Sequence, residues 1–479
     1  MPIALQNNFS GGIASDPREA STTKFAVAKN FDIFSKKSLS PYLDTVEDAT
    51  DADHKATDVI LSTALYALGV DNNLNNHPGI LKRGGSAFTS AGDSGFAGTA
   101  IAGSLVECDS LLMFLISSGG NTLLKSFNKS TEAYASVGTI TGTSSYTPKP
   151  FLFQRKNTLY IGVGSTIARY DASTDVFTAS AITVPSNMTI TSITNYGVYV
   201  AIGCSPKNIG ENSKVYIWDG DASATDWTDM LDFGEGSLTI LENLGGTLVG
   251  ISGVVLGGLG STYVKNAKLI IRTYNGGKVG IEKEMSSDTI GLSNFKARKD
   301  DKVYFPLRLK VQGNEVWQLW VFGMNDNEDW VLSPDRLLCG ATAIEAVLGF
   351  NMIGDQIWTS VTSGLLRTTT TSYPTSTLDT LINPAMPIAD KTKHKQLKAI
   401  AVKTLGAGGE ITVSYKVDSG TWVEVYSGAV NAVSIKEATN ESTGTPFLDG
   451  YEYQFRVATT DGVEIAEIKY KYDILPTLF

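Results

Sequence analysis

The chain has 479 residues, of which 39 are basic and 49 are acidic, so its formal net charge is −10. Charged residues make up 18% of the sequence and hydrophobic residues 42%, which is too apolar for a disordered chain and too polar for a membrane bundle. With only three histidines and three cysteines, the composition excludes a disulfide scaffold and a zinc-finger array, and its acidity excludes a basic nucleic-acid coat. The length predicts two or three domains, each able to form its own hydrophobic core.

Residues 1–50 differ in texture from the rest of the chain. No basic region leads into a long apolar stretch, so we expect no secretory signal and a protein that is made in the cytoplasm. The segment Asn8–Ile13 is rich in glycine, and Phe25–Phe34 alternates small, apolar and polar residues. We therefore predict an extended N-terminal arm. Because such an arm cannot bury itself alone, it should lie on the domain that follows or on a neighbouring subunit.

Short apolar runs, rich in β-branched and aromatic residues, recur between residues 51 and 380, and helical periodicity is nearly absent. The clearest unit, Phe151–Phe177, reads as an apolar strand, a polar turn, a Leu-Tyr strand, a glycine turn and a strand ending in tyrosine before an Asp-containing loop. Such units repeat roughly every 40 to 55 residues, which is the period expected of propeller blades. Their central positions are Tyr66, Phe114, Tyr160, Tyr199, Val249, Tyr304 and Trp358. The repeat predicts an all-β fold, a β-propeller of about seven blades, with six or eight as alternatives.

A further strand of each unit is also recognisable, as in Leu123–Phe127, Val215–Trp218 and Trp317–Phe322. The alternative architecture, a string of β-sandwiches, would need longer strands and fewer glycine turns. Trp218-Asp219 resembles the dipeptide of one propeller family, but it stands alone and assigns no family.

An uncharged segment of the repeat region, residues 244–264, is long enough to cross a bilayer. Its many glycines contribute little transfer free energy and disfavour a helix by about 1 kcal/mol each. We expect two short strands joined by a glycine-rich loop, and no stable membrane insertion. The alternative is a loop that inserts into a membrane when it is triggered.

The texture changes again beyond Pro374. A Thr/Ser run and two prolines form a linker, and alternating strands follow in residues 388–479. Two sets of alternating residues should each share one face of a strand: Ile411, Val413, Tyr415 and Val417, and Tyr451, Tyr453, Phe455 and Val457. Turns are indicated at Asp418-Ser-Gly420 and Asp461-Gly462. This region is predicted to be a separate small β-sandwich.

The histidines and cysteines show no spacing typical of a metal site or a redox pair. We expect solvated loop histidines at His54, His77 and His394. We expect buried, reduced thiols in strands at Cys108, Cys204 and Cys339. The sequence therefore predicts no cofactor and no catalytic set.

Two acidic loops could offer oxygen ligands to calcium: Asp219 with Asp221, Asp226 and Asp229, and the run 326–329. No glutamate follows at the spacing of an EF-hand loop, so ordinary Asx turns are the preferred interpretation. Asp418–Trp422 resembles the Asp-box turn of sialidases, but Lys416 stands where that turn has Ser or Thr. We interpret it as a hairpin turn with a packed tryptophan.

The most specific pattern lies in the N-terminal arm. The run Phe9-Ser-Gly-Gly-Ile-Ala-Ser-Asp-Pro-Arg18, an Asn30-Phe-Asp element and the stretch Leu39-Ser-Pro-Tyr42 resemble the start of the tail nozzle proteins of short-tailed bacteriophages, the family of tail tubular protein B. About forty residues carry the resemblance. It implies a structural protein of the virion, assembled in the host cytoplasm, in a homo-oligomeric and usually sixfold ring around the DNA exit channel.

On this resemblance, the ring would meet adjacent tail adaptor or fibre proteins, hold the channel closed and then pass DNA without binding it specifically. The net negative charge fits such a lumen, because it repels phosphates. Five residues of the arm are the expected assembly contacts: Gly11, Gly12, Pro17, Arg18 and Asn30. The alternative is that they only complete the ring of blades within their own chain.

Two other functions stay open at this point. A propeller that binds a host-surface glycan would repeat aromatic and Asn or Asp residues at one loop position per blade, which only Tyr170-Asp171 and Trp218-Asp219 suggest. A glycosidase would need two carboxylates facing each other across a sugar, and no particular pair can be nominated.

Overall fold

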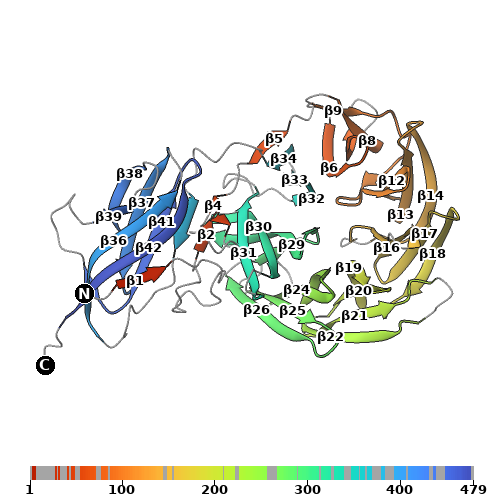
Figure 1. Cartoon of the computed structure of the whole chain (residues 1–479). Coiled ribbons are helices and arrows are strands. Elements are labelled where there is room, and N and C mark those ends of the chain that lie inside the picture. Colours follow the sequence, from red (N-terminus) through yellow and green to blue (C-terminus); the bar gives the residue numbers. More distant parts are fainter. Residues whose placement is uncertain are drawn as a thin grey trace. The chain divides into compact units, whose positions relative to one another are not determined.

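The computed structural model in Figure 1 describes most of the chain from residue 54 onward and five short strands before it. The described residues are 3–6, 27–29, 31–32, 40–41, 45–48, 54–71, 77–84, 87–143, 148–153, 156–208, 210–221, 226–255, 267–287, 290–311, 314–324, 328–338, 347–354, 356–361, 364–368, 379–382, 393–405, 408–430, 435–438 and 448–475. Their regular structure is β-strand throughout, and they include no helix able to span a membrane.

Seven sheets within the described residues follow one another in chain order and are the blades of a β-propeller. Blade 1 contains β6 (His54–Leu61), β7 (Leu65–Asp71), β8 (His77–Gly84) and β9 (Ala87–Ser90). Blade 2 contains β10 (Thr99–Ala100), β11 (Val106–Cys108), β12 (Leu111–Ser118), β13 (Asn121–Asn128) and β14 (Ala133–Thr141). Blade 3 contains β15 (Phe151–Phe153), β16 (Thr158–Val163), β17 (Thr166–Asp171) and β18 (Val176–Thr183).

The next four sheets repeat this antiparallel order. Blade 4 contains β19 (Met188–Tyr196), β20 (Tyr199–Pro206), β21 (Asn212–Trp218) and β22 (Asp229–Glu235). Blade 5 contains β23 (Ser237–Leu244), β24 (Thr247–Val255), β25 (Ala267–Tyr274) and β26 (Gly280–Ser287). Blade 6 contains β27 (Ile290–Leu292), β28 (Ala297–Lys299), β29 (Lys302–Val311), β30 (Asn314–Met324) and β31 (Trp330–Leu337). Blade 7 contains β32 (Val347–Ile353), β33 (Gln356–Val361), β34 (Gly364–Thr368) and, from the N-terminal arm, β5 (Thr45–Asp48).

The seven central positions predicted from the repeat all fall in the second strand of a blade, one in each. Most of them are buried between neighbouring sheets, as the pattern predicts. Tyr304 is only half-buried, and Tyr199 is 36% exposed, because it is the first residue of β20 and precedes the buried Val200. The predicted strands around residues 123–127, 215–218 and 317–322 are the third strands β13, β21 and β30.

The turn between the first and second strands has the same backbone in most blades. One residue there has a φ between +49° and +62°, a left-handed conformation that Gly, Asn and Asp tolerate best. These residues are Asp109, Asn157, Gly197, Gly245, Asp300 and Gly354. The small polar and glycine residues that punctuate the sequence repeat are therefore required by the turn.

Blade 7 packs against blade 1 through side-chain hydrogen bonds to main-chain carbonyls. Asn351 Nδ2 donates to Val59 O at 2.8 Å, and the hydroxyl of Ser360 donates to Ala56 O. These contacts join residues about three hundred positions apart and close the ring. Because β5 supplies the outermost strand of blade 7, both ends of the propeller sequence contribute to one sheet.

Two further sheets form the β-sandwich. The first contains β1 (Ile3–Gln6), β42 (Glu464–Ile474), β36 (Lys395–Leu405), β39 (Ile435–Ala438) and β40 (Asp449–Gly450). The second contains β2 (Val27–Lys29), β35 (Asp379–Ile382), β41 (Tyr453–Thr459), β37 (Glu410–Val417) and β38 (Val423–Ala429). A two-stranded ladder of β3 (Phe31–Asp32) and β4 (Ser40–Pro41) completes the described arm.

The core of the sandwich follows the alternation of its strands. All four predicted residues of β37 are buried, and the rings of Phe455 and Tyr470 stack between the two sheets at 3.8 Å. The prediction for Tyr451 is wrong: it precedes β41, 46% of its surface is exposed, and its ring lies 5.1 Å from that of His394. The turns at Asp418 and Asp461 have positive φ, as hairpin turns with Asp-Gly or Asp-Ser sequences require.

Residue contacts divide the chain into two compact units. The first combines Met1–Thr45, Gln318–Leu337 and Thr369–Phe479, and the second combines Val46–Trp317 and Leu338–Thr368. In Figure 1 the sheets of the second unit follow one another around a common centre. The uncharged segment 244–264 begins at the end of β23, turns at Gly245-Gly246 and continues as β24; its remaining residues lie outside the described part of the chain.

Candidate functional site

The five predicted assembly residues, Gly11, Gly12, Pro17, Arg18 and Asn30, lie outside the described residues. Their neighbours along the chain are described as short strands. β1 pairs antiparallel with β42, from Ile3 opposite Lys471 to Gln6 opposite Ile468, and β2 pairs antiparallel with β35. The arm was expected on the propeller or on a neighbouring subunit, whereas β1 and β2 extend the two sandwich sheets of their own chain. Among the described strands of the arm, β5 joins the propeller as the outer strand of blade 7, and β2 and β3 contact β31 of blade 6.

The innermost strands of the propeller carry buried charges that the sequence pattern did not reveal. On one side, Lys296, which precedes β28 in blade 6, lies 2.9 Å from Glu242 of β23 in blade 5. The Lys296 ammonium also donates to Leu241 O and, at 3.3 Å, to Ile193 O of β19 in blade 4. The second oxygen of Glu242 accepts a hydrogen bond from the Thr194 hydroxyl at 3.1 Å. One ion pair thus joins the inner strands of blades 4, 5 and 6, and we refer to it as the Lys296 clasp.

A second buried charge joins blades 1, 2 and 3. Asp58 of β6 accepts hydrogen bonds from the backbone N–H groups of Val59 at 2.9 Å and of Leu105, in the inner segment of blade 2, at 3.0 Å. Lys149, just before β15 of blade 3, places its ammonium 3.6 Å from Asp58 Oδ2, the oxygen that also accepts the Leu105 N–H. Burial raises the pKa of Asp58, and the Lys149 charge and the two N–H groups partly oppose that rise. We refer to this group as the Asp58 clasp.

Both clasps coincide with irregularities in the inner strands. The register with the second strand shifts between Ala56 and Asp58 in blade 1, and between Ile190 and Ser192 in blade 4. Blade 5 shows the same shift between Leu238 and Ile240. A β-bulge re-aims the side chains that follow it, which lets polar groups of an inner strand reach the next blade. The clasps therefore hold the ring of blades together, and the geometry assigns them no reacting partner.

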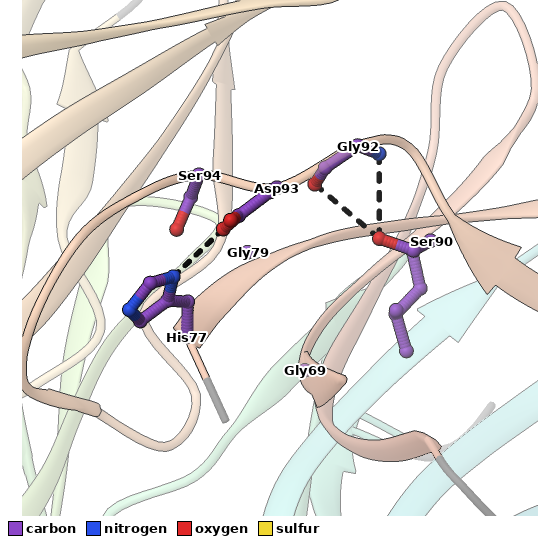
Figure 2. A pocket seen from close by; sticks show the side chains of 8 residues that line it. Gly69, His77, Gly79, Ser90, Gly92, Asp93 and Ser94 are labelled. Atoms are coloured by element: carbon purple, nitrogen blue, oxygen red, sulfur yellow. Dashed lines mark hydrogen bonds and ion pairs between the residues drawn. The ribbon is translucent and has the colours of Figure 1, made fainter. Parts of the chain in front are cut away.

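A shallow hollow on blade 1, shown in Figure 2, is lined by glycines, two serines and a His–Asp pair. His77 Nδ1 lies 2.7 Å from Asp93 Oδ1, which also accepts the Gly95 N–H at 2.9 Å. The Ser94 hydroxyl donates to Pro78 O at 2.7 Å, whereas the His77 ring is joined to Asp93. The hollow encloses a volume of about 10 Å³, which is about the space for one water molecule and too little for a small-molecule ligand. His77 is thus the first residue of β8 and is held by Asp93, so the prediction of a solvated loop histidine is wrong at this position.

The acidic loop of blade 4 consists of Asx turns among its described residues. Asp219 Oδ1 accepts the N–H of Asp221 at 2.9 Å, and its carbonyl accepts Lys156 Nζ at 2.7 Å. Asp229 Oδ1 accepts the N–H of Met230 at 2.7 Å. No group of three metal-ligating side chains occurs within the described ranges. The oxygens of this loop are directed to its own backbone, as expected for Asx turns.

The two cysteines that the structure describes are buried, as predicted. Burial raises the pKa of Cys108 to about 11, and it also raises the pKa of Cys204. Both thiols therefore stay protonated and unreactive at neutral pH. Cys339 lies outside the described residues. In the sandwich, Trp422 packs beneath the cationic groups of Lys416 and Arg456, at 5.3 and 4.9 Å, so the turn at Asp418–Trp422 carries a packed tryptophan, as interpreted.

No family model and no curated protein matches the chain. The solved structure of YjhT is similar to 59% of this chain and 98% of its own, with 12% identity and a TM-score of 0.36. The β-propeller domain of the Trilobed protease from Pyrococcus furiosus, reported with an open velcro topology, is similar to 67% of this chain and 94% of its own, with 13% identity and a TM-score of 0.41. At such scores neither similarity bears on function, and the assignment of a propeller rests on the hydrogen-bonded sheets.

Proposed function

We propose that this protein is a structural component of a bacteriophage tail, a hub or nozzle subunit that assembles into a ring and performs no reaction. One observation carries the proposal beyond the sequence resemblance. The segments bearing the nozzle-like motif connect strands β1, β2 and β5, each of which completes a sheet in another part of the chain. An arm used in this way fastens sheets of its own chain, and on this proposal the motif-bearing segments between its strands make the contacts with neighbouring subunits that the resemblance implies.

The polar contacts of the propeller support the proposal of a structural role. Both clasps tie inner strands of three consecutive blades with charged groups that are mostly withdrawn from water. Buried ion pairs add little net stability, but they cost several kcal/mol to break one partner at a time, so they resist partial opening. Because the clasps join the inner strands of successive blades, on this proposal DNA passes through the opening of the oligomeric ring and not through the centre of a single propeller.

The proposal is tested by the mass of the purified full-length chain, from size-exclusion chromatography with light scattering and from negative-stain images. We expect ring-shaped particles of about six copies, alone or with tail extracts of the phage that encodes the chain. A stable monomer under all of these conditions, combined with selective binding on a glycan array, would replace the proposal with a glycan-binding propeller. Hydrolysis of polysaccharides by the purified chain would replace it with a glycosidase.

A further inference from the structure

The outermost strands of the blades differ in how their free edges are protected. An edge strand offers unpaired N–H and C=O groups, and proteins commonly shorten such a strand or place charges or proline on it. In the described propeller, β5 and β9 have four residues each, β22 and β26 carry charged residues, and β31 carries charged residues and Pro334. β14 and β18 have nine and eight residues and contain neither a charged residue nor a proline. These two edges therefore lack the usual protection against pairing with another strand.

β14 is the more regular of the two edges. It is the last strand of its sheet and reads Ala-Tyr-Ala-Ser-Val-Gly-Thr-Ile-Thr, and its pairing with β13 has one shift, which leaves Val137 without a partner. In β18, by contrast, residues 179–181 have no partner in β17. Because an antiparallel strand directs its N–H and C=O groups alternately to its two sides, every second residue of β14 directs them away from β13. No strand or loop within the described ranges is hydrogen-bonded to that outer side of β14.

The side chains of β14 leave this outer edge open to another strand. Its exposed side chains are all small: Ala133, Ala135, Ser136, Thr139 and Thr141. Lys125 of β13 donates to Ser136 Oγ at 2.7 Å, but only 7% of the Lys125 surface is exposed, so it places no exposed charge beside the strand. On the face toward blade 3, the ring of Phe177 in β18 packs directly on Gly138. The neighbouring blade thus supports β14 on one face, and no large side chain stands at its edge.

We propose that the free edge of β14 binds an extended segment of another protein, which adds an outer antiparallel strand to blade 2. Main-chain hydrogen bonds would supply the affinity, as in other cases of strand addition.

The edge also indicates the chemistry of the added segment. Because β14 carries no charged side chain, a charged residue placed opposite it would gain no partner, so the segment should be uncharged over about six residues. The small side chains of Ala135 and Thr139 leave room for β-branched or aromatic side chains across from them, which stabilise a sheet through such pairs. A second copy of β14 would place small side chains opposite small ones and fill this room poorly. The inference does not depend on the proposed ring, because it involves neither the arm nor the clasps.

The test uses the full-length chain and a labelled peptide of the same length as β14 that alternates valine with threonine, measured by fluorescence anisotropy. Methyl groups on alternate backbone nitrogens leave this peptide one edge that can pair, so it cannot stack on itself. The control peptide has the same sequence and is methylated at every backbone nitrogen. We expect the first peptide to bind at least about tenfold more tightly than the control, with no dependence on salt because the contact involves no charges. Hydrogen exchange should show protection by the first peptide in residues 133–141.

Matched variants locate the binding. Ala135→Lys with Thr139→Lys gives β14 the charges that other outer strands carry, and it should weaken the first peptide about tenfold without changing the thermal midpoint, because both side chains are exposed. Met230→Lys with Ile281→Lys adds the same two charges to exposed positions of β22 and β26, and it should leave the affinity unchanged.

Three results would overturn the proposal: equal binding of the two peptides, protection of β18 or of another strand in place of β14, or unchanged affinity in the variant with lysines on β14. Light scattering that showed a dimer of the chain, lost in that same variant, would assign the edge to a second copy and also overturn it.

Discussion

The Lys296 clasp makes the most direct prediction about the propeller. In Lys296→Met the side chain keeps its length, but Glu242 loses the cation 2.9 Å from its carboxylate, and two inner-strand carbonyls lose their donor. The side chains of Lys296 and Glu242 are only 15% and 11% exposed, so water cannot replace the lost partner fully. Leaving one charge of a buried pair unpaired costs about 3–5 kcal/mol, and we expect the propeller to lose stability in this range.

Substitution of Glu242, the partner of Lys296, completes a double-mutant cycle. Glu242→Gln keeps an oxygen that can accept the hydroxyl of Thr194, and it removes the unpaired charge. The variant carrying both Lys296→Met and Glu242→Gln should therefore be more stable than Lys296→Met alone. The coupling free energy between the two positions should be at least about 1 kcal/mol.

Urea unfolding with hydrogen exchange resolved by peptide is the assay, because it follows blades 4–6 separately from the sandwich. Lys82→Met is the matched control: Lys82 and Glu132 also join two blades, at 2.8 Å, but their side chains are 42% and 49% exposed. We expect this variant to unfold almost as the wild type does, because solvent screens an exposed pair. If Lys296→Met and Lys82→Met had equally small effects, the reasoning that buried charges hold the ring would be refuted.

Four further predictions concern single residues. Burial raises the pKa of Asp58, so ionisation of this carboxyl opposes folding. The contribution of the protonated form to stability is therefore lost as pH rises through the raised pKa. Urea midpoints from about pH 4 to 7 should show this dependence in the wild type and lack it in Asp58→Asn. Asp58→Ala leaves the Leu105 N–H without its acceptor and should lower the free energy of unfolding by about 1–3 kcal/mol. Tyr160→Phe removes the 2.7 Å hydrogen bond to Gly220 O between blades 3 and 4, which should cost about 1 kcal/mol in the same assay. In the sandwich, a Cβ added by Gly450→Ala would overlap a valine side chain, so the thermal midpoint of that domain should fall by the equivalent of about 1–3 kcal/mol.

Local sequence was sufficient for the repeating parts of the fold. The seven central positions all lie in second strands because each blade alternates a buried strand with a turn, and both leave a signal within a few residues. Gly, Asn and Asp mark the first turn of most blades because the backbone there has a positive φ. In the sandwich, the alternation from Ile411 to Val417 predicted the buried face of β37 for the same local reason.

Contacts between distant segments were decided by the tertiary structure alone. Nothing within residues 45–48 indicates that they pair with β34, more than three hundred residues later, because the hydrogen bonds of an edge strand come from the backbone and require no particular side chain. Lys296 and Glu242, or Asp58 and Lys149, look like ordinary surface charges in the sequence. They become buried partners only when bulged inner strands of successive blades meet near the centre of the propeller, and that meeting depends on the path of the whole chain rather than on any local pattern.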